Sequence, residues 1–271
     1  MIYGVSMIEA GGLSPEEALA QVAAAGFTQV ELSSWESPVG RWWRDPARMR
    51  TLLESAGLRA RSVHTPEGGW NIDDPDEAKR GAAIEAASSV FGPAASAGVE
   101  VVICHPNYST HTFTVEDYGA SIARSVASLG ILAERAARAG LKLAVENLPV
   151  RGTARPAGSV DEVLRMIDGL DSHVGLCVDA GHANANGRSA AGELRVGRGK
   201  ILAVHIHDND GLGQDQHLMP GKGTTDWDAF VRTLDDVAPD CIRNFEVLPV
   251  DGKVPETLAA LAALRSSWEK R

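Results

Sequence analysis

Histidines and carboxylates recur directly after short apolar runs of this 271-residue chain. Each apolar run is typical of a buried β-strand, and the polar residue comes where the strand would end. In a closed parallel sheet all such ends lie on one rim, so residues far apart in the sequence converge there. The residues in these positions are His64, His105, Glu146, Asp179, His205 and Glu246.

Three carboxylates and one imidazole stand out within this set: Glu146, Asp179, His205 and Glu246. Such a mixed oxygen and nitrogen set suits Mn²⁺, Co²⁺, Mg²⁺, Fe²⁺ or Zn²⁺ and lacks the thiolates of a structural zinc site. So many polar groups beside a core would be costly without a compensating cation or hydrogen bonds. We therefore expect a divalent metal at these four residues, and more than one ion stays open.

Two polar segments follow the sixth and seventh expected strands. His182 lies in the first, and Asp215 and His217 stand two apart in the second. Side chains two apart in an extended chain point to the same side, so these three residues could hold a second cation or contact substrate. A solvated loop in which Asp215 pairs with a lysine is the alternative. We expect His207 to point away from His205 and favour no direct role for it.

Tryptophans also surround the expected rim. Trp42 and Trp43 fall within residues 36–44, Trp35 precedes them, and Trp70 follows the third strand. Aromatic rings can stack on a sugar or wedge into DNA, so Trp70 is a candidate substrate contact. Packing over the mouth of the fold is the alternative.

The elements that would position these residues alternate between short β-like runs and Ala-rich helical segments, which indicates a parallel sheet. Gly57 and Gly98 each end a helical run just before a strand, where a left-handed C-cap is expected. No GxGxxG or P-loop pattern follows the first strand, although a doubly wound sheet stays the alternative. We predict one α/β domain over residues 1–271, a (β/α)8 TIM barrel with strands near residues 2–6, 28–32, 58–63, 99–104, 141–145, 174–178, 201–206 and 242–247.

Composition limits the partners. The net charge is −10 and no Lys/Arg run stands out, which argues against nucleic acid. No run is long enough to span a membrane and no signal-peptide pattern begins the chain, so we expect a cytoplasmic protein without a membrane partner. Three widely spaced cysteines indicate buried thiols rather than disulfides. Cys104 and Cys177 adjoin candidate residues and are expected to pack beneath the site.

The motifs resemble the xylose isomerase-like TIM barrel superfamily over nearly the whole chain. The segments that carry the resemblance are residues 145–147, 178–182, 204–208 and 215–223, with Trp227 after the last. The superfamily contains sugar isomerases and epimerases, inosose dehydratases and endonuclease IV-type AP endonucleases.

The resemblance to sugar epimerases implies one divalent metal at Glu146, Asp179, His205 and Glu246. It also implies that the two glutamates form an acid–base pair and that His182 contacts substrate. The nucleases hold three zinc ions from nine positions, and this sequence keeps all nine: His64, His105, Glu146, Asp179, His182, His205, Asp215, His217 and Glu246. The acidic charge and the short rim loops depart from the nucleases.

We therefore expect a metal-dependent sugar isomerase or epimerase that abstracts a proton next to a carbonyl and stabilises an enediolate. Its partner would be a small-molecule sugar or keto-polyol, and a homo-oligomer stays open. The alternatives are a keto-sugar or cyclitol dehydratase, a zinc-dependent AP endonuclease-like phosphodiesterase, and a sugar-binding protein without activity.

Overall fold

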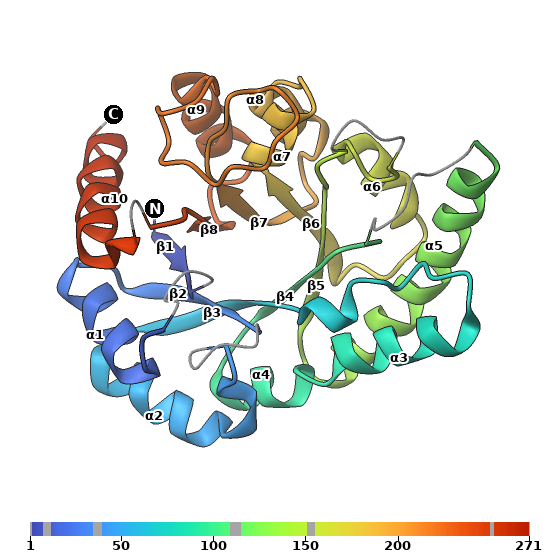
Figure 1. Cartoon of the computed structure of the whole chain (residues 1–271), viewed down its shortest axis with the longest axis horizontal. Helices are drawn as coiled ribbons and strands as arrows, with labels where there is room; N and C mark the ends of the chain where they lie inside the picture. The colour runs from blue at the N-terminus through green and yellow to red at the C-terminus, as the bar shows by residue number, and fades with distance from the viewer. Residues whose placement is uncertain are drawn as a thin grey trace.

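Eight parallel strands pair in sequence order and close into a barrel, as Figure 1 shows. The computed structural model describes residues 2–7, 12–34, 40–108, 115–150, 155–249 and 252–270. The strands are β1 (Tyr3–Ser6), β2 (Gln29–Ser33), β3 (Arg59–His64), β4 (Val101–Cys104), β5 (Lys142–Glu146), β6 (Val174–Asp179), β7 (Ile201–Ile206) and β8 (Ile242–Phe245). The predicted (β/α)8 barrel is confirmed, and the last strand ends two residues earlier than expected.

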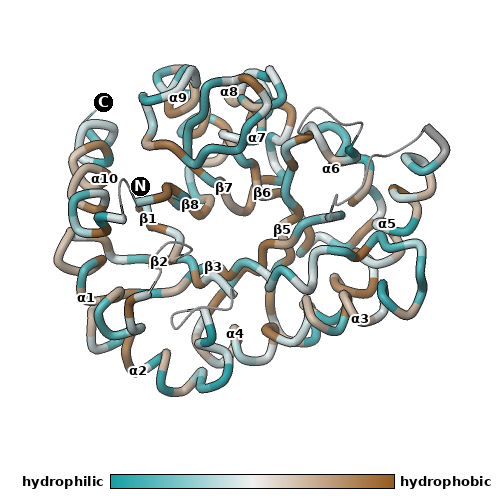
Figure 2. The backbone as a smooth tube through the Cα atoms, in the orientation of Figure 1, coloured by the Kyte–Doolittle hydropathy of each residue, from teal (hydrophilic) through white to brown (hydrophobic). Residues whose placement is uncertain are grey.

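Helices form the outer layer of the barrel. They are α1 (Pro15–Ala24), α2 (Pro46–Ala56), α3 (Glu77–Ser88), α4 (Phe91–Ala97), α5 (Val115–Arg138), α6 (Val160–Met166), α7 (Ala180–Ala185), α8 (Ala190–Val196), α9 (Trp227–Val237) and α10 (Val254–Trp268), with 3-10 turns η2 (Trp42–Arg44) and η3 (Glu67–Gly69). Gly57 and Gly98 adopt the left-handed C-caps expected of them, with φ of 69° and 85°. Figure 2 shows hydrophobic and hydrophilic residues alternating around outer helices such as α2 and α10.

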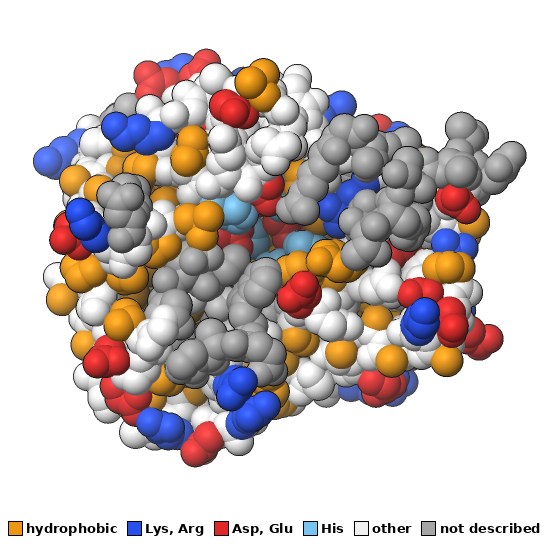
Figure 3. Space-filling view, in the orientation of Figure 1, with side chains coloured by type: hydrophobic (Ala, Val, Ile, Leu, Met, Phe, Trp, Pro, Cys, Tyr) orange, Lys and Arg blue, Asp and Glu red, His pale blue; other side chains and the backbone are white. Residues whose placement is uncertain are grey.

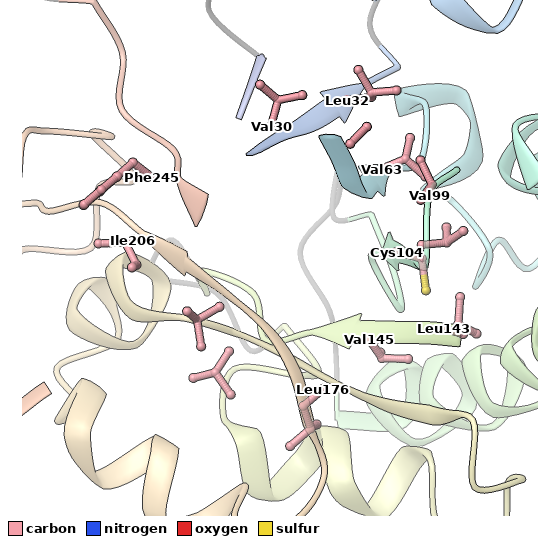
Figure 4. Close-up of a cluster of buried hydrophobic side chains, with 14 of the residues drawn as sticks. Val30, Leu32, Val63, Val99, Cys104, Leu143, Val145, Leu176, Ile206 and Phe245 are labelled. Atoms are coloured by element: carbon pink, nitrogen blue, oxygen red, sulfur yellow. The ribbon is translucent and has the colours of Figure 1, made fainter. Parts of the chain in front are cut away.

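Side chains alternate between the two faces of each strand. Outward-facing residues such as Val30, Leu143 and Val145 pack in the large core between strands and helices, part of which Figure 4 shows. The small inner cluster fills the barrel itself and consists of Val101, Ile103, Ala144, Cys177, Ala203 and Ile242. A side chain two positions from an inner residue of the same strand must therefore also point into the barrel.

The three cysteines are free. Cys177 belongs to the inner cluster, below the strand ends, as expected. The same expectation is wrong for Cys104, which faces outward in the layer between strands and helices (Figure 4), because it has the opposite parity to Ile103. None of the described helices is both long and apolar enough to cross a membrane.

Candidate metal centre

Strand alternation turns the strand-end residues toward the barrel axis. Glu146 follows the inner residue Ala144 by two positions, and Asp179 follows the inner residue Cys177 in the same way. A register shift between Leu176 and Cys177 brings Asp179 opposite His205 on β7. Figure 3 shows histidine side chains at the bottom of a central hollow, with acidic side chains beside them.

The central group consists of Glu146, Asp179, His205 and Glu246, each of which places one ligand atom within 4.8 Å of the other three. His205 Nδ1 lies 3.1 Å from Glu146 Oε1 and 3.1 Å from Glu246 Oε2. The same nitrogen lies 3.7 Å from Asp179 Oδ2. The four residues therefore come from four strands or strand ends and surround one small volume.

The central group has the chemistry of a divalent-cation site. Its carboxylates are at most 5% exposed, and within the described ranges their ion pairs involve histidines rather than Lys or Arg. Burial opposes the charge of Glu146, but His205 and His105 hold its pKa well below the usual range. Burial likewise opposes the charge of Asp179, but His182 and His207 lower its pKa. Ionised carboxylates this close need positive charge between them, which a cation would supply.

The β3–β4 group consists of His64, His105 and Glu146. Each histidine places its Nε2 atom 3.3 Å from Glu146 Oε2. Burial lowers the pKa of His105 to about 3, so its imidazole is neutral and can offer a lone pair. Glu146 thus turns one oxygen to the central group and the other to the β3–β4 group, an arrangement in which a carboxylate can bridge two ions.

The loop group consists of His182, His207, Asp215 and His217. Asp215 Oδ2 lies 3.2 Å from His182 Nε2, and Asp215 Oδ1 lies 3.2 Å from His217 Nε2. Burial would lower the pKa of His182, but the charges of Asp179 and Asp215 raise it to about 9. Burial is likewise outweighed at His217, where Asp215 raises the pKa to about 10. The three loop residues singled out in the sequence, His182, Asp215 and His217, therefore converge.

His207 joins the loop group, so the expectation that it points away is wrong. Its Nε2 atom lies 3.0 Å from Asp179 Oδ2, and its ring stacks on His217 at 4.1 Å between centroids. Residues two apart along an extended chain face the same side, which places His207 on the His205 side. Gly181 provides the space, because a Cβ atom there would lie only 2.0 Å from the His207 ring.

Asp208 anchors the loop that carries Asp215 and His217. Its carboxylate accepts hydrogen bonds from the backbone N–H groups of residues 209, 221, 223 and 225 and from Trp227 Nε1, at 2.8–3.2 Å. Asp208 and Leu218 also exchange two backbone hydrogen bonds of 2.8 Å. The buried carboxylate thereby ties both ends of a long polar loop to the end of β7.

Asn147 fastens the ends of β5 and β6 together. Its side chain donates to the Asp179 carbonyl at 3.0 Å and accepts from the Asp179 N–H at 2.8 Å. The Asp179 side chain caps α7 by accepting from the His182 N–H, so its Oδ1 is engaged while Oδ2 faces the other ligands. The backbone around two candidate ligands is thus fixed by local hydrogen bonds.

Trp70 lies behind the histidines rather than at an open rim. It is 7% exposed, its Nε1 donates to the Thr65 carbonyl at 3.0 Å, and its ring lies 4.3 Å from that of His105. Stacking of Trp70 on a sugar therefore stays a prediction. Trp42 is buried in the core, and Trp35 lies outside the described residues.

Glu31 was not predicted as a site residue from the sequence. This fully buried carboxylate lies on β2, and its Oε1 is 3.0 Å from His205 Nε2. The available signal was a charged residue between the apolar residues Val30 and Leu32 of an expected strand. Because both neighbours face outward, Glu31 has to face the barrel interior.

Sequence comparison relates most of the chain to known proteins. Residues 19–266 match the family of xylose isomerase-like TIM barrels. The chain is 28% identical over 258 residues to the uncharacterized protein MJ1311 of Methanocaldococcus jannaschii, which covers 91% of this chain and 83% of that protein. It is 26% identical over 238 residues to a probable endonuclease 4 of Thermoplasma acidophilum, which covers 80% of this chain and 78% of that protein.

Solved structures show the same architecture. A D-tagatose 3-epimerase-like protein superimposes with a TM-score of 0.86 at 22% identity, covering 99% of this chain and 97% of the other. The IOLI protein with a bound zinc atom gives a TM-score of 0.81 at 18% identity, with coverage of 99% and 97%. At such identities the likeness shows the fold alone. Together with the family match over residues 19–266, it leads to one conclusion: the chain belongs to the xylose isomerase-like TIM barrel family.

Proposed function

We propose that this protein is a divalent-metal-dependent isomerase or epimerase of a small sugar or keto-polyol. The observation that carries the proposal is the meeting of two glutamates from non-adjacent strand ends. Glu146 Oε1 and Glu246 Oε2 each lie 3.1 Å from His205 Nδ1. A substrate carbon held between two such carboxylates can lose its proton to one and regain a proton from the other.

The surrounding residues suit this chemistry. Glu146 and Glu246 are 1% and 5% exposed, so bulk water has little access to the proton that they exchange. His182 Nδ1 donates to the Asn147 carbonyl at 2.8 Å and lies 3.5 Å from Glu146 Oε1, which orients its ring beside the pair. A divalent ion in the central group would stabilise the negative charge that develops on neighbouring substrate oxygens.

The comparisons support the substrate class and the metal. One similar structure is described as a D-tagatose 3-epimerase-like protein, and another holds a zinc atom. The central group offers three carboxylates and one imidazole, a set compatible with Mn²⁺, Co²⁺, Mg²⁺, Fe²⁺ or Zn²⁺. Both observations favour a sugar whose carbonyl and neighbouring hydroxyl can be chelated.

Hydrogen exchange in heavy water tests the proposal. The protein is loaded in turn with Mn²⁺, Co²⁺ or Zn²⁺ and incubated with a panel of ketohexoses and ketopentoses, and deuterium at the carbon next to the carbonyl is measured by mass spectrometry. We expect incorporation with at least one sugar. We expect Glu246→Gln to reduce it by roughly 10²–10⁴-fold while ions stay bound. Unchanged exchange in Glu246→Gln would exclude the proposed acid–base role.

A second candidate is phosphodiester hydrolysis at an abasic site. It is favoured by the central group and the β3–β4 group, which share Glu146, because adjacent ions could clamp both oxygens of a phosphoryl displacement. The net charge of −10 disfavours a DNA substrate. Nicking of an abasic duplex by the zinc-loaded protein, weakened steeply by salt, would favour this candidate over the epimerase.

A further inference from the structure

We infer that Glu31 is a positioning residue for His205: its carboxylate holds the imidazole so that Nδ1, and not Nε2, faces the central group. The inference rests on the metal site of the proposed function but not on its sugar chemistry. It assigns a task to a fully buried carboxylate that belongs to none of the ligand groups found among the described residues.

The two nitrogens of His205 face different carboxylates. On one side, Nδ1 lies 3.1 Å from both Glu146 and Glu246. On the other side, Nε2 lies 3.0 Å from Glu31 Oε1. With Nε2 donating its hydrogen to Glu31, the lone pair of Nδ1 is directed at the ligands. Histidines that bind metals generally donate their second ring N–H to a carboxylate or carbonyl in this manner.

Glu31 is in turn held by two other strands. Its Oε2 accepts from Ser62 Oγ at 2.8 Å and from Asn244 Nδ2 at 2.9 Å. Asn244 Nδ2 also donates to Ser62 Oγ at 2.9 Å, which closes a small polar network. Both oxygens of Glu31 are therefore engaged below the ring, so the carboxylate supports His205 and is not itself placed as a ligand.

The backbone is shaped for this network. The register between β2 and β3 shifts between Val30 and Glu31, and the shift sets Glu31 directly opposite Ser62. Asn244, on β8, is the strand partner of His205 on β7. Gly4 leaves room for the amide, since a Cβ atom there would lie 2.7 Å from Asn244 Oδ1. Features from several strands thus converge on a single His205–Glu31 contact.

A structural role alone does not explain the arrangement well. Glu31, Ser62 and His205 are fully buried, and a buried carboxylate is costly unless its hydrogen bonds compensate for the lost hydration. An apolar residue would fill the barrel at no such cost, as Ala203 and Ile242 do nearby. The charge has a purpose if it sets the tautomer and the basicity of a metal-binding imidazole.

The test measures zinc affinity and the tautomer of His205. Zn²⁺ is titrated against a competing chelator into the wild type and Glu31→Gln, which keeps the side-chain volume but removes the charge. We expect binding at the central group to weaken by roughly 10–100-fold in Glu31→Gln. Ser62→Ala is the matched control, because it removes one hydrogen bond to Glu31 Oε2 but leaves the contact with His205. Its zinc affinity should fall by less than about tenfold.

Nitrogen-15 NMR of histidine in the zinc-bound wild type gives a second readout that needs no variant. We expect His205 to carry its hydrogen on Nε2 with Nδ1 bound to zinc. A hydrogen on Nδ1, or equal zinc affinity in the wild type and Glu31→Gln, would overturn the inference. Failure of the wild type to bind zinc at all would instead defeat the metal site of the proposed function. If Glu31→Gln does not fold, the wild-type tautomer still decides.

Discussion

Glu146 Oε2 lies 3.3 Å from His105 Nε2, while the other oxygen of the same carboxylate faces His205. One glutamate at the end of β5 therefore belongs to two ligand groups at once. Adjacent groups that share a carboxylate are the arrangement expected where two ions lie close together. This contact predicts more than one ion per chain, a number that can be measured directly.

We predict that the wild type binds more than one zinc ion per chain and that His105→Ala binds one fewer. The reason is that His105 contributes to the β3–β4 group but not to the central group. Metal content after loading and desalting, measured by mass spectrometry, checks the prediction. His173→Ala is the control, since His173 bonds the Ala133 carbonyl and belongs to none of the ligand groups. Equal zinc content in His105→Ala and the wild type would show that the β3–β4 group holds no ion.

A close approach at Gly181 gives a second prediction. A Cβ atom there would lie 2.0–2.6 Å from three atoms of the His207 ring, so Gly181→Ala must displace that ring. We expect a loss of about 1–3 kcal/mol in the free energy of unfolding and weaker metal binding at the loop group. Urea unfolding and zinc titration measure the two effects.

Gly130→Ala is the matched control for this change. Gly130 lies within α5, and a Cβ atom there would meet nothing within 4 Å. Its substitution should raise the free energy of unfolding by about 0.5–1 kcal/mol through helix propensity. If Gly181→Ala also stabilised the protein, the His207 ring would not be held where the structure places it.

Periodicity in the sequence was enough to predict the barrel and the rim. Apolar runs followed by a polar residue located Glu146, Asp179 and His205 at the correct strand ends, because a parallel barrel gathers all such ends. Glu246 lies one residue beyond β8 but is still fixed by its N–H, which donates to the Ile206 carbonyl at 3.1 Å. Its position therefore did not depend on the predicted strand boundary.

Other features depend on contacts that periodicity does not encode. Glu31 can be identified as a site residue only once it is known which residues of β2 face the barrel interior. The register shift beside it depends on the pairing with β3. The loop group depends on how residues 208–227 fold around Asp208, which joins backbone groups far along the chain. Strand alternation, in contrast, does place His207 on the same side as His205. The prediction that His207 points away was therefore wrong.

The pKa values of the loop-group histidines predict how pH affects the ion-free protein. Their folded-state values, about 9 for His182 and about 10 for His217, lie above the usual unfolded value of about 6.5. The protonated histidines therefore contribute their full stabilisation of the fold below about pH 6.5. This contribution is lost as pH rises through about 9 to 10.

The measurement is urea unfolding in the presence of a chelator at pH 7, 8.5 and 10. Other groups also titrate in this range, so the double variant His182→Asn/His217→Asn serves as the reference. We expect the wild type to lose more stability than the reference between pH 7 and 10. Parallel curves for the two proteins would show that these histidines carry no extra proton in the folded state.

The carboxylate of Asp208 accepts five hydrogen bonds from the loop between β7 and α9 and from the start of α9. Asp208→Asn keeps the shape but replaces one acceptor oxygen with a donor, so two or three buried N–H groups lose their partner. Each unsatisfied group costs about 1–3 kcal/mol, partly relieved by water, and we expect a total loss of about 2–4 kcal/mol in the free energy of unfolding.

Asp210→Asn is the control within the same loop, because Asp210 is partly exposed and accepts from two groups of the described residues, the Leu212 N–H and Gln216 Nε2. The free energy of unfolding of Asp210→Asn should fall by less than about 1 kcal/mol. Since Asp208 also positions the segment that carries Asp215 and His217, Asp208→Asn should weaken zinc binding at the loop group while the central group, built on strand ends, keeps its affinity. An equal loss at both groups would contradict this prediction and would mean that the contact between His207 and Asp179 couples the loop to the central group.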